Sequence, residues 1–430
     1  MTFLLSVLGV GAVLLVAWLL GFVVSAALLQ GGERFRLERL GWSYGLGCAL
    51  LAASVPPALA LHVAPMLVLI AIAAVLLALL RRFPLLPEAV RGPSPARVPA
   101  ILTAAAGLGV AVYVLRALTE PMWANDYIAI WGLKGKTIYG ARSYPDWLTS
   151  LEYAHPEYPV GLPLLYAAVS FAIGHWDDHA MALLFPLFQI ATLCVLVGWL
   201  LRRGVSPQIA GLAAALVAWF EPLYSGFLAG MAEVPLAFGV LLFGSALADA
   251  LDETDEGSLR RLVVAVLMIA ALKNEGLFFA IVGALIALVF GKGRRWKVAF
   301  AALAPALLMR VLHWPWRSRI PLADFESGLF STERVWDSIV AAGRLLGWSA
   351  WIGLALVAVL IVAGRSVVAG NRLLLLAFAA LAAYLVIPAF AVRGPAWLID
   401  TTLLRTTAAL APLLAAAVAV RYAGEEPRAA

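Results

Sequence analysis

The sequence predicts an all-α protein, a polytopic bundle of transmembrane helices. Of its 430 residues, 63% are hydrophobic and only 13% are charged, and the mean hydropathy is +0.95. Soluble domains carry roughly 25% charged residues. Apolar runs of about 17–23 residues recur along the chain, which is the length that a hydrocarbon core about 30 Å thick requires. We therefore expect residues 1–430 to form a single transmembrane domain.

The apolar runs predict about thirteen spans. Residues 161–174 are apolar enough to add another, but a crossing there would move the basic pair Arg202 and Arg203 to the other side of the membrane. We expect a re-entrant or interfacial helix there, and about fourteen spans is the alternative. The candidate spans are residues 3–29, 41–62, 64–80, 99–117, 179–201, 207–221, 232–250, 261–273, 275–291, 297–313, 345–364, 371–391 and 402–420.

Basic residues gather in the short segments between the spans and predict the orientation. Because basic loops stay in the cytoplasm, we expect the N-terminus outside and the C-terminus in the cytoplasm. This use of the basic residues also explains the net charge of +6 without a nucleic-acid partner. The Ala- and Arg-rich composition is typical of a GC-rich bacterium, which indicates a bacterial inner membrane. The basic segments are 33-ERFRLER-39, 81–97, Arg202/Arg203, Arg260/Arg261, 292-KGRRWK-297 and Arg365/Arg372.

Two long segments are expected on the outer face, residues 118–160 and 314–343. The first is rich in tryptophan and tyrosine, and it carries Asp126, Ile130 and Lys134 at a spacing that places them on one helix face. The aromatic residues and lysines alone are also explained by an interfacial anchor, with the lysines reaching to the headgroups. A carboxylate next to a bilayer needs a partner or a task, so Asp126 is a candidate functional residue.

Further polar residues are expected on the same face. His155 and Glu157 lie in 155-HPEYP-159, and Glu233 begins a span, where a carboxylate also complements the helix dipole. Lys273 interrupts an apolar hairpin, which a polar turn with a local ion pair would also explain. Arg405 lies inside the last span, and intramembrane arginines that do not reach the interface are usually functional.

Two other segments carry weaker signals. Arg317 and Arg319 lie beside tryptophans in the second outer segment, which favours cation–π stacking or a headgroup-phosphate site. A surface amphipathic cover explains the same residues. The run 175-HWDDH-179 holds residue types that ligate metals, but its short spacing indicates a metal only weakly. Cys48 and Cys194 have no neighbouring cysteine, so they predict neither a metal site nor a disulfide framework.

The order of these motifs resembles that of the GT-C glycosyltransferases, the superfamily of the aminoarabinose transferase of lipid A and the protein O-mannosyltransferases. Bacterial members carry a first loop similar to Asp-Ala-x-x-x-Trp-x-Leu-Lys-Ala-Lys, and this chain reads 126-DYIAIWGLKGK-136. The chain departs from the pattern at three places. Asn125 precedes Asp126, so that Glu120 is the nearest upstream acid, and glutamates replace the usual aspartates at Glu157 and Glu233.

The resemblance implies an inverting transfer of a sugar from a polyprenyl-phosphate carrier to a glycan, lipid or protein acceptor at the periplasmic face. Asp126 is then the expected general base. The phosphate would be bound by Arg405, since a guanidinium can hold it through two hydrogen bonds. Lys134, Lys136 and Lys273 are expected to assist it. Glu233, with Glu120, His155 and Glu157, is expected to orient the acceptor or to help bind a divalent cation, Mg²⁺ or Mn²⁺, for which Asp126 and Glu233 are the candidate ligands.

Two other functions fit the same composition. A multi-span transporter would place its polar residues near the middle of the membrane, often at broken helices, whereas here we expect them at one face. A polysaccharide polymerase or ligase of another membrane fold also uses lipid-linked sugars, but it does not need the Asp126 loop followed by the 155-HPEYP-159 motif.

Overall fold

The structure is a computed structural model, which describes residues 2–28, 36–80, 97–149, 154–252, 256–291, 293–313, 329–346 and 371–425. Within these ranges every regular element is a helix, which confirms the all-α prediction. The elements are α1 (Thr2–Leu28), α2 (Arg36–Ala53), α3 (Val55–Ala60), α4 (Pro65–Leu80), α5 (Ala100–Thr119), η2 (Tyr127–Trp131), α6 (Gly132–Ala141), η3 (Asp146–Thr149), α7 (Gly161–Ile173), η5 (Ala180–Leu183), α8 (Leu184–Arg202), α9 (Pro207–Ala218), η6 (Gly226–Leu228), α10 (Glu233–Asp252), α11 (Glu256–Leu272), α12 (Glu275–Phe290), α13 (Arg295–His313), α14 (Thr332–Leu346), α17 (Arg372–Val386), η9 (Ile387–Phe390), α18 (Pro395–Ala408) and α19 (Ala411–Glu425).

In the described ranges, seven helical segments are long and apolar enough to cross a membrane, and α18 with α19 makes an eighth if this pair, bent by 50°, is one span. These helices support a polytopic membrane protein, but they do not confirm thirteen spans. The seven segments are Phe3–Ala26, Leu37–Ala60, Ala100–Thr119, Ala180–Arg202, Glu233–Asp252, Arg295–His313 and Arg372–Phe390.

Several predicted spans are too short in the structure. Helix α9 has 12 residues and α12 has 16. At 1.5 Å per residue they reach about 18 Å and 24 Å, less than a hydrocarbon core of about 30 Å. The predicted span 64–80 is likewise the 16-residue helix α4, and α11 begins with the charged residues around Glu256. Residues 347–364 of the predicted span 345–364 lie outside the described ranges.

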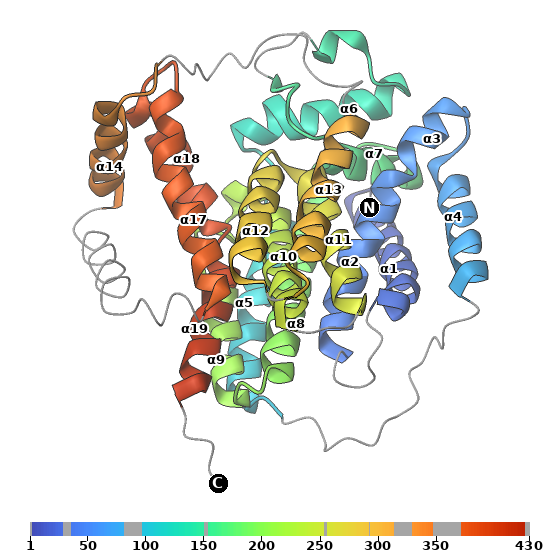
Figure 1. Ribbon diagram of the computed structural model, residues 1–430. Coiled ribbons are helices and arrows are strands. Elements are labelled where there is room, and N and C mark those ends of the chain that lie inside the picture. Colours follow the sequence, from blue (N-terminus) through green and yellow to red (C-terminus); the bar gives the residue numbers. More distant parts are fainter. Residues whose placement is uncertain are drawn as a thin grey trace.

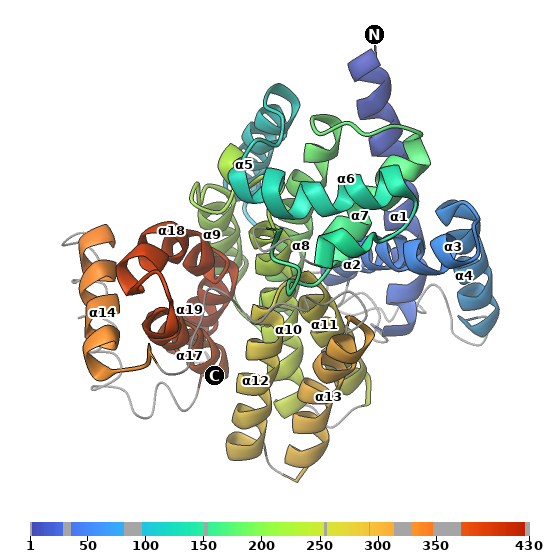
Figure 2. The same ribbon diagram turned by 90° about the horizontal axis from the view of Figure 1, so that it is seen from above.

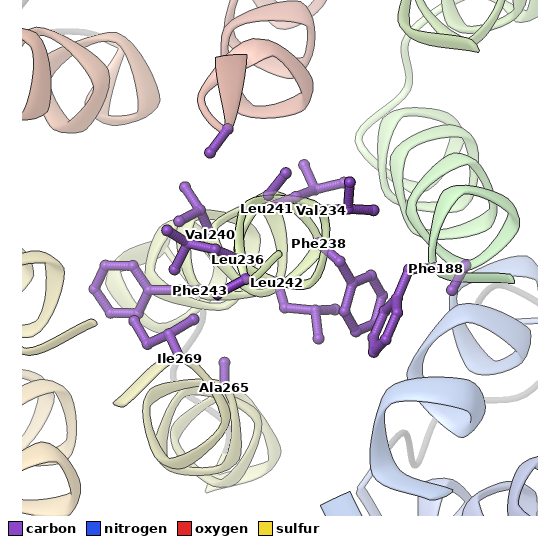
Figure 3. Close-up of a cluster of buried hydrophobic side chains, with 14 of the residues drawn as sticks. Phe188, Val234, Leu236, Phe238, Val240, Leu241, Leu242, Phe243, Ala265 and Ile269 are labelled. Atoms are coloured by element: carbon purple, nitrogen blue, oxygen red, sulfur yellow. The ribbon is translucent and has the colours of Figure 1, made fainter. Parts of the chain in front are cut away.

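Helix α10 is the centre of the bundle. It is almost wholly buried, and its side chains are apolar on every face, as expected for a helix surrounded by others. Phe238 packs against Phe188 of α8, and Figure 3 shows Ile269 and Ala265 of α11 on another side of the helix. Helices α12, α13, α17, α18 and α19 complete the surroundings of α10. Any group at either end of α10 is therefore held in a fixed position.

Helices α1 and α2 approach each other through glycines. A Cβ atom added to Gly47 would lie 2.0 Å from the carbonyl oxygen of Ala17, and one added to Gly21 would lie 1.8 Å from that of Ser43. Small residues allow two backbones to come this close, which is a common way for helices to associate within a membrane. The predicted first two spans are thus a tightly packed pair.

The first long segment forms η2 and α6, and α6 lies across one end of the bundle beside α7 (Figures 1 and 2). We call this the α6 end. This confirms that the segment is helical. The helix is amphipathic, since Ile130 and Ile138 are buried whereas Ile128 is exposed.

Helix α7 lies within residues 161–174, the segment for which the sequence left open a re-entrant or interfacial helix or a further span. Its 13 residues reach about 20 Å, which is too short to cross the hydrocarbon core. Of the second predicted outer segment, residues 314–328 lie outside the described ranges, and α14 packs beside α18.

Candidate functional site

Asp126 lies at the start of the π-helix η2, where the chain leaves the loop after α5 and enters α6. Single π-helical turns are rare and frequently occur at functional sites. The Asp126 carboxylate forms an ion pair with the guanidinium of Arg405, which is 279 residues later in the chain. Both side chains remain partly exposed, at 30% for Asp126 and 19% for Arg405. The ion pair therefore lies at the surface of the bundle rather than in its core.

Glu233 is the first residue of α10 and its side chain is almost completely buried. Its Oε1 atom lies 3.2 Å from the Nζ of Lys273 and 3.7 Å from the Nε of Arg405. Glu233 is thus held by two cations from other segments, and Arg405 lies between the two carboxylates of Asp126 and Glu233.

Lys273 lies between α11 and α12 and joins two carboxylates. Its Nζ is 2.8 Å from Oε1 of Glu275, in addition to its contact with Glu233. The turn around it is tight, since a Cβ atom on Gly276 would lie 2.2 Å from the carbonyl oxygen of Ile269. The sequence interpretation of a polar turn with a local ion pair is confirmed in part, because the lysine also reaches α10.

Arg405 lies on α18, close to the bend of 50° that separates α18 from α19. It completes a group that we call the ion-pair cluster, with three carboxylates against two cations, a formal net charge of −1. The members come from the first long segment, the start of α10, the α11–α12 turn and α18. The ion-pair cluster consists of Asp126, Glu233, Lys273, Glu275 and Arg405.

Lys134 lies elsewhere, on the buried side of α6. Its Nζ donates a hydrogen bond of 2.6 Å to the carbonyl oxygen of His155, and its side chain is fully buried. Burial lowers the pKa of Lys134 to about 7, against a smaller opposing effect of the Glu157 carboxylate. No ion pair in the described residues joins Lys134 to a carboxylate of the cluster, and Lys136 is exposed. The structure thus does not bring these two lysines into the ion-pair cluster.

His155 and Glu157 form a local support for the 155–159 turn. His155 Nδ1 lies 2.8 Å from Oε1 of Glu157, and the backbone of His155 has a φ of +46°, a conformation that costs energy for a residue with a side chain. Burial alone would raise the pKa of Glu157, but the hydrogen bond and charge of His155 outweigh it and lower this pKa below its usual value. Lys134 and Glu157 together hold His155 in this conformation.

Tyr158 connects this turn to the ion-pair cluster. Its ring is stacked between those of Trp131 and His155, with centroid distances of 5.5 Å and 5.0 Å. The charged side chains that act on its hydroxyl include Lys273 and Arg405. The residues of the 155–159 motif therefore support one side of the cluster, and they do so through Tyr158 rather than through His155 and Glu157 directly.

The run 175-HWDDH-179 binds Tyr127, the residue that follows Asp126. The carboxylate of Asp178 accepts hydrogen bonds from the hydroxyl of Tyr127 and, at 2.6 Å, from Nε1 of Trp176. Asp177 precedes η5 and accepts hydrogen bonds from the backbone N–H groups of His179 and Ala180. The aspartates that suggested a weak metal signal therefore make contacts within the fold, and no pattern in the sequence predicts that Asp178 binds the residue next to Asp126.

Glu120 is exposed at the end of α5, and its carboxylate lies against Gly226. Among the described residues it forms no ion pair, so the structure does not join it to the cluster. Within those same ranges, no three His, Cys, Asp or Glu side chains gather as a metal site. Asp126 and Glu233 are the carboxylates that the sequence suggested for a divalent cation, and both contact Arg405. A cation held by both would have to displace that guanidinium.

Comparison of the chain with protein-family models, curated proteins and solved structures found no match. The resemblance to GT-C glycosyltransferases therefore rests on the sequence motifs of this chain alone.

Proposed function

We propose that this protein is an inverting glycosyltransferase that moves a sugar from a polyprenyl-phosphate carrier to an acceptor at the α6 end of the bundle. The observation that carries the proposal is the contact of Arg405 with both Asp126 and Glu233. Through this contact Arg405, whose guanidinium is suited to bind a phosphate, meets the candidate base Asp126 from a distant part of the chain. The proposal places this end at the periplasmic face of a bacterial inner membrane, with the N-terminus outside and the C-terminus in the cytoplasm.

The ion pair of Asp126 and Arg405 suggests how binding prepares the reaction. The donor phosphate is a diester with one negative charge, and one guanidinium can hold it through two hydrogen bonds, so it would take the place of Asp126 on Arg405. Its charge increases as the bond to the sugar breaks, which favours this contact in the transition state. The released carboxylate would then accept a hydrogen bond from the acceptor hydroxyl. Lys273, although already paired with Glu233 and Glu275, adds positive charge to the same region.

The chemical step is a single displacement. The acceptor oxygen attacks the anomeric carbon, its proton passes to the Asp126 carboxylate, and the bond from the anomeric carbon to the phosphate oxygen breaks. The electron pair of that bond leaves with the polyprenyl phosphate, whose charge Arg405 stabilises. Because attack and departure occur on opposite faces of the sugar, the anomeric configuration is inverted. We route no step through a divalent cation.

Exposed apolar side chains lie close in sequence to Asp126 and Arg405. Ile128 in η2 is 60% exposed and Leu404 in α18 is 50% exposed. Side chains of this kind are expected where a protein contacts lipid tails, and they support the approach of a polyprenyl chain from the bilayer. The acceptor class, a glycan, a lipid or a protein side chain, is part of what the experiment must identify.

A transporter is the second candidate. It is favoured by the break between α18 and α19 close to Arg405, because transporters bind substrates at interrupted helices. The position of the ion-pair cluster at one end of the bundle favours the transferase instead. A polysaccharide polymerase or ligase of another membrane fold would share the donor class and would differ in its product.

The test is transfer from radiolabelled polyprenyl-phosphate sugars by the purified protein, with membrane lipid extract as acceptor. We expect transfer by the wild type and a loss of at least about 100-fold in Asp126→Asn, with donor binding retained. Asp146→Asn is the matched control, since Asp146 is an exposed aspartate of the same segment. Full activity of Asp126→Asn would remove it from the chemistry. No transfer from any donor, with uptake of a solute into vesicles, would support the transporter.

A further inference from the structure

Three buried polar atoms at the ion-pair cluster have no hydrogen-bond partner among the described residues. They are Oε2 of Glu233, Nε of Arg405 and the hydroxyl of Tyr384. Buried polar groups in proteins are nearly always hydrogen-bonded, and each exception calls for an explanation such as a bound ligand. Three exceptions in one region indicate that a group other than the described residues completes this region.

Tyr384 was not suggested by the sequence, where it is one aromatic residue in an apolar run. It lies on α17, is 8% exposed, and α17 packs against both α10 and α12. The charged side chains that act on its hydroxyl are Glu275, Lys273 and Glu233. The hydroxyl thus lies within electrostatic reach of the cluster and forms no hydrogen bond among the described residues. A bridging polar group would satisfy both sides.

Arg405 closes this region in the structure. Its Nη1 holds Asp126, and its Nε lies 3.7 Å from Glu233 without a hydrogen bond. The free oxygen of Glu233 and the Tyr384 hydroxyl are both shielded from solvent. The guanidinium now covers one side of Glu233. If it moved toward a phosphate, that side would become accessible to the group bonded to the phosphate.

We propose that Glu233 and Tyr384 form an inner subsite for the hydroxyl groups of the transferred sugar, which opens when a phosphate draws Arg405 away from the carboxylates. The proposal rests on the proposed function and names the part of the donor that these residues recognise. A sugar fits because each hydroxyl both donates and accepts, so one can donate to Oε2 of Glu233 while another pairs with Tyr384. A carboxylate that accepts from a sugar hydroxyl also selects for its position on the ring.

The test compares neryl methyl phosphate, a diester with the same single charge as the donor, with neryl phosphate that carries a hexose or a pentose, by titration calorimetry on the purified full chain. The quantity of interest is the ratio of the two dissociation constants, which reports what the sugar adds to the phosphate. We expect at least one sugar to tighten binding in the wild type. Tyr384→Phe removes one hydroxyl and keeps the ring, and we expect it to reduce this ratio by about fivefold to tenfold.

Tyr113→Phe is the matched control, because the Tyr113 hydroxyl on α5 is also buried and unpartnered, and Arg116 rather than a member of the cluster is the charged side chain that acts on it. Tyr113→Phe should leave the ratio unchanged. In Tyr384→Phe, the binding of neryl methyl phosphate should match that of the wild type. A ratio of one with every sugar, or an equal ratio in wild type and Tyr384→Phe, overturns the subsite. Failure of neryl methyl phosphate itself to bind would instead count against the proposed function, so the two failures are distinguishable.

Discussion

Helix α10 carries a charged group at each end, and the two groups are built differently. At the α6 end, Glu233 uses one carboxylate oxygen for Lys273 and Arg405 and leaves the other without a partner. At the other end, roughly 24 Å away along the helix axis, Asp249 has both oxygens bound, one by Trp199 and Arg203 and the other by Arg202. We call this second group the Arg202 network.

The Arg202 network is closed within the chain. Arg202 binds both oxygens of Glu38, at 2.7 Å and 3.2 Å, and also reaches Asp249 at 2.5 Å. Asp252 is bound by Arg203 through one oxygen and by Arg372 through the other. All three carboxylates thus have both oxygens occupied, and the network ties α2, α8, α10 and α17 together.

The comparison separates a structural role from a functional one. Both groups contain buried charge, so burial alone does not mark a site. In the Arg202 network every carboxylate oxygen is occupied, although Nε of Arg203 has no partner, which indicates that these carboxylates serve the fold. The unused carboxylate oxygen of Glu233 instead leaves the ion-pair cluster able to accept a ligand. Removing a charge should therefore cost stability at one end and activity at the other.

The largest effect is expected for Arg202→Ala. Removing Arg202 leaves the buried Glu38 carboxylate without its hydrogen-bonded cation and leaves Asp249 with Arg203 and Arg261 as its cations among the described residues. Breaking a buried ion pair in this way costs about 3–5 kcal/mol. Thermal unfolding of the protein in detergent measures it, with exposed Arg295→Ala as the control. An Arg202→Ala protein as stable as the wild type would show that the network is dispensable.

Arg405→Lys tests the other end and should have the next largest effect. Lysine keeps the charge and loses the planar fork that binds a phosphate twice, so we expect sugar transfer to fall by about 100-fold, roughly 2.7 kcal/mol in the transition state. The unfolding temperature should change little, because Arg405 is partly exposed. Unfolding of Arg405→Lys at a much lower temperature would place Arg405 with the Arg202 network.

Lys134 should give the smallest effect within any one pH unit, because it acts through a dependence of stability on pH. Its folded pKa of about 7 lies below the unfolded value of about 10.4, so between these values the unfolded chain binds one proton more. Stability therefore rises with pH from about 7 to 10, by at most about 1.4 kcal/mol per unit, and is lost as pH falls through this window.

Lys134→Met should flatten this rise, and unfolding temperatures of both proteins between about pH 7.5 and 9.5 would measure the difference. Lys136→Met is the matched control, since Lys136 is exposed on the same helix. Parallel curves for wild type and Lys134→Met would show that Lys134 stays charged in the folded protein.

The sequence by itself determined the helical membrane character and most of the ion-pair cluster. Apolar runs must become helices in lipid, because a helix satisfies its own backbone hydrogen bonds. Scarce charges among such runs are conspicuous, so Asp126, Glu233, Lys273 and Arg405 could be chosen before the structure was known. The number of spans could not be predicted in this way. A short apolar helix such as α9 can be buried by neighbouring helices as well as by lipid, so its apolar character does not show that it crosses the membrane.

Only the tertiary structure decided which charges meet. Lys134 lies near Asp126 in the sequence, yet in α6 its side chain is buried and binds the carbonyl oxygen of His155. Lys273 is far from Asp126 in the sequence, and the α11–α12 turn places it beside Glu233. Tyr384 is one aromatic residue within an apolar helix and becomes part of the site only because α17 packs against α10. Contacts between distant segments depend on how helices pack, and no local pattern of residues specifies that packing.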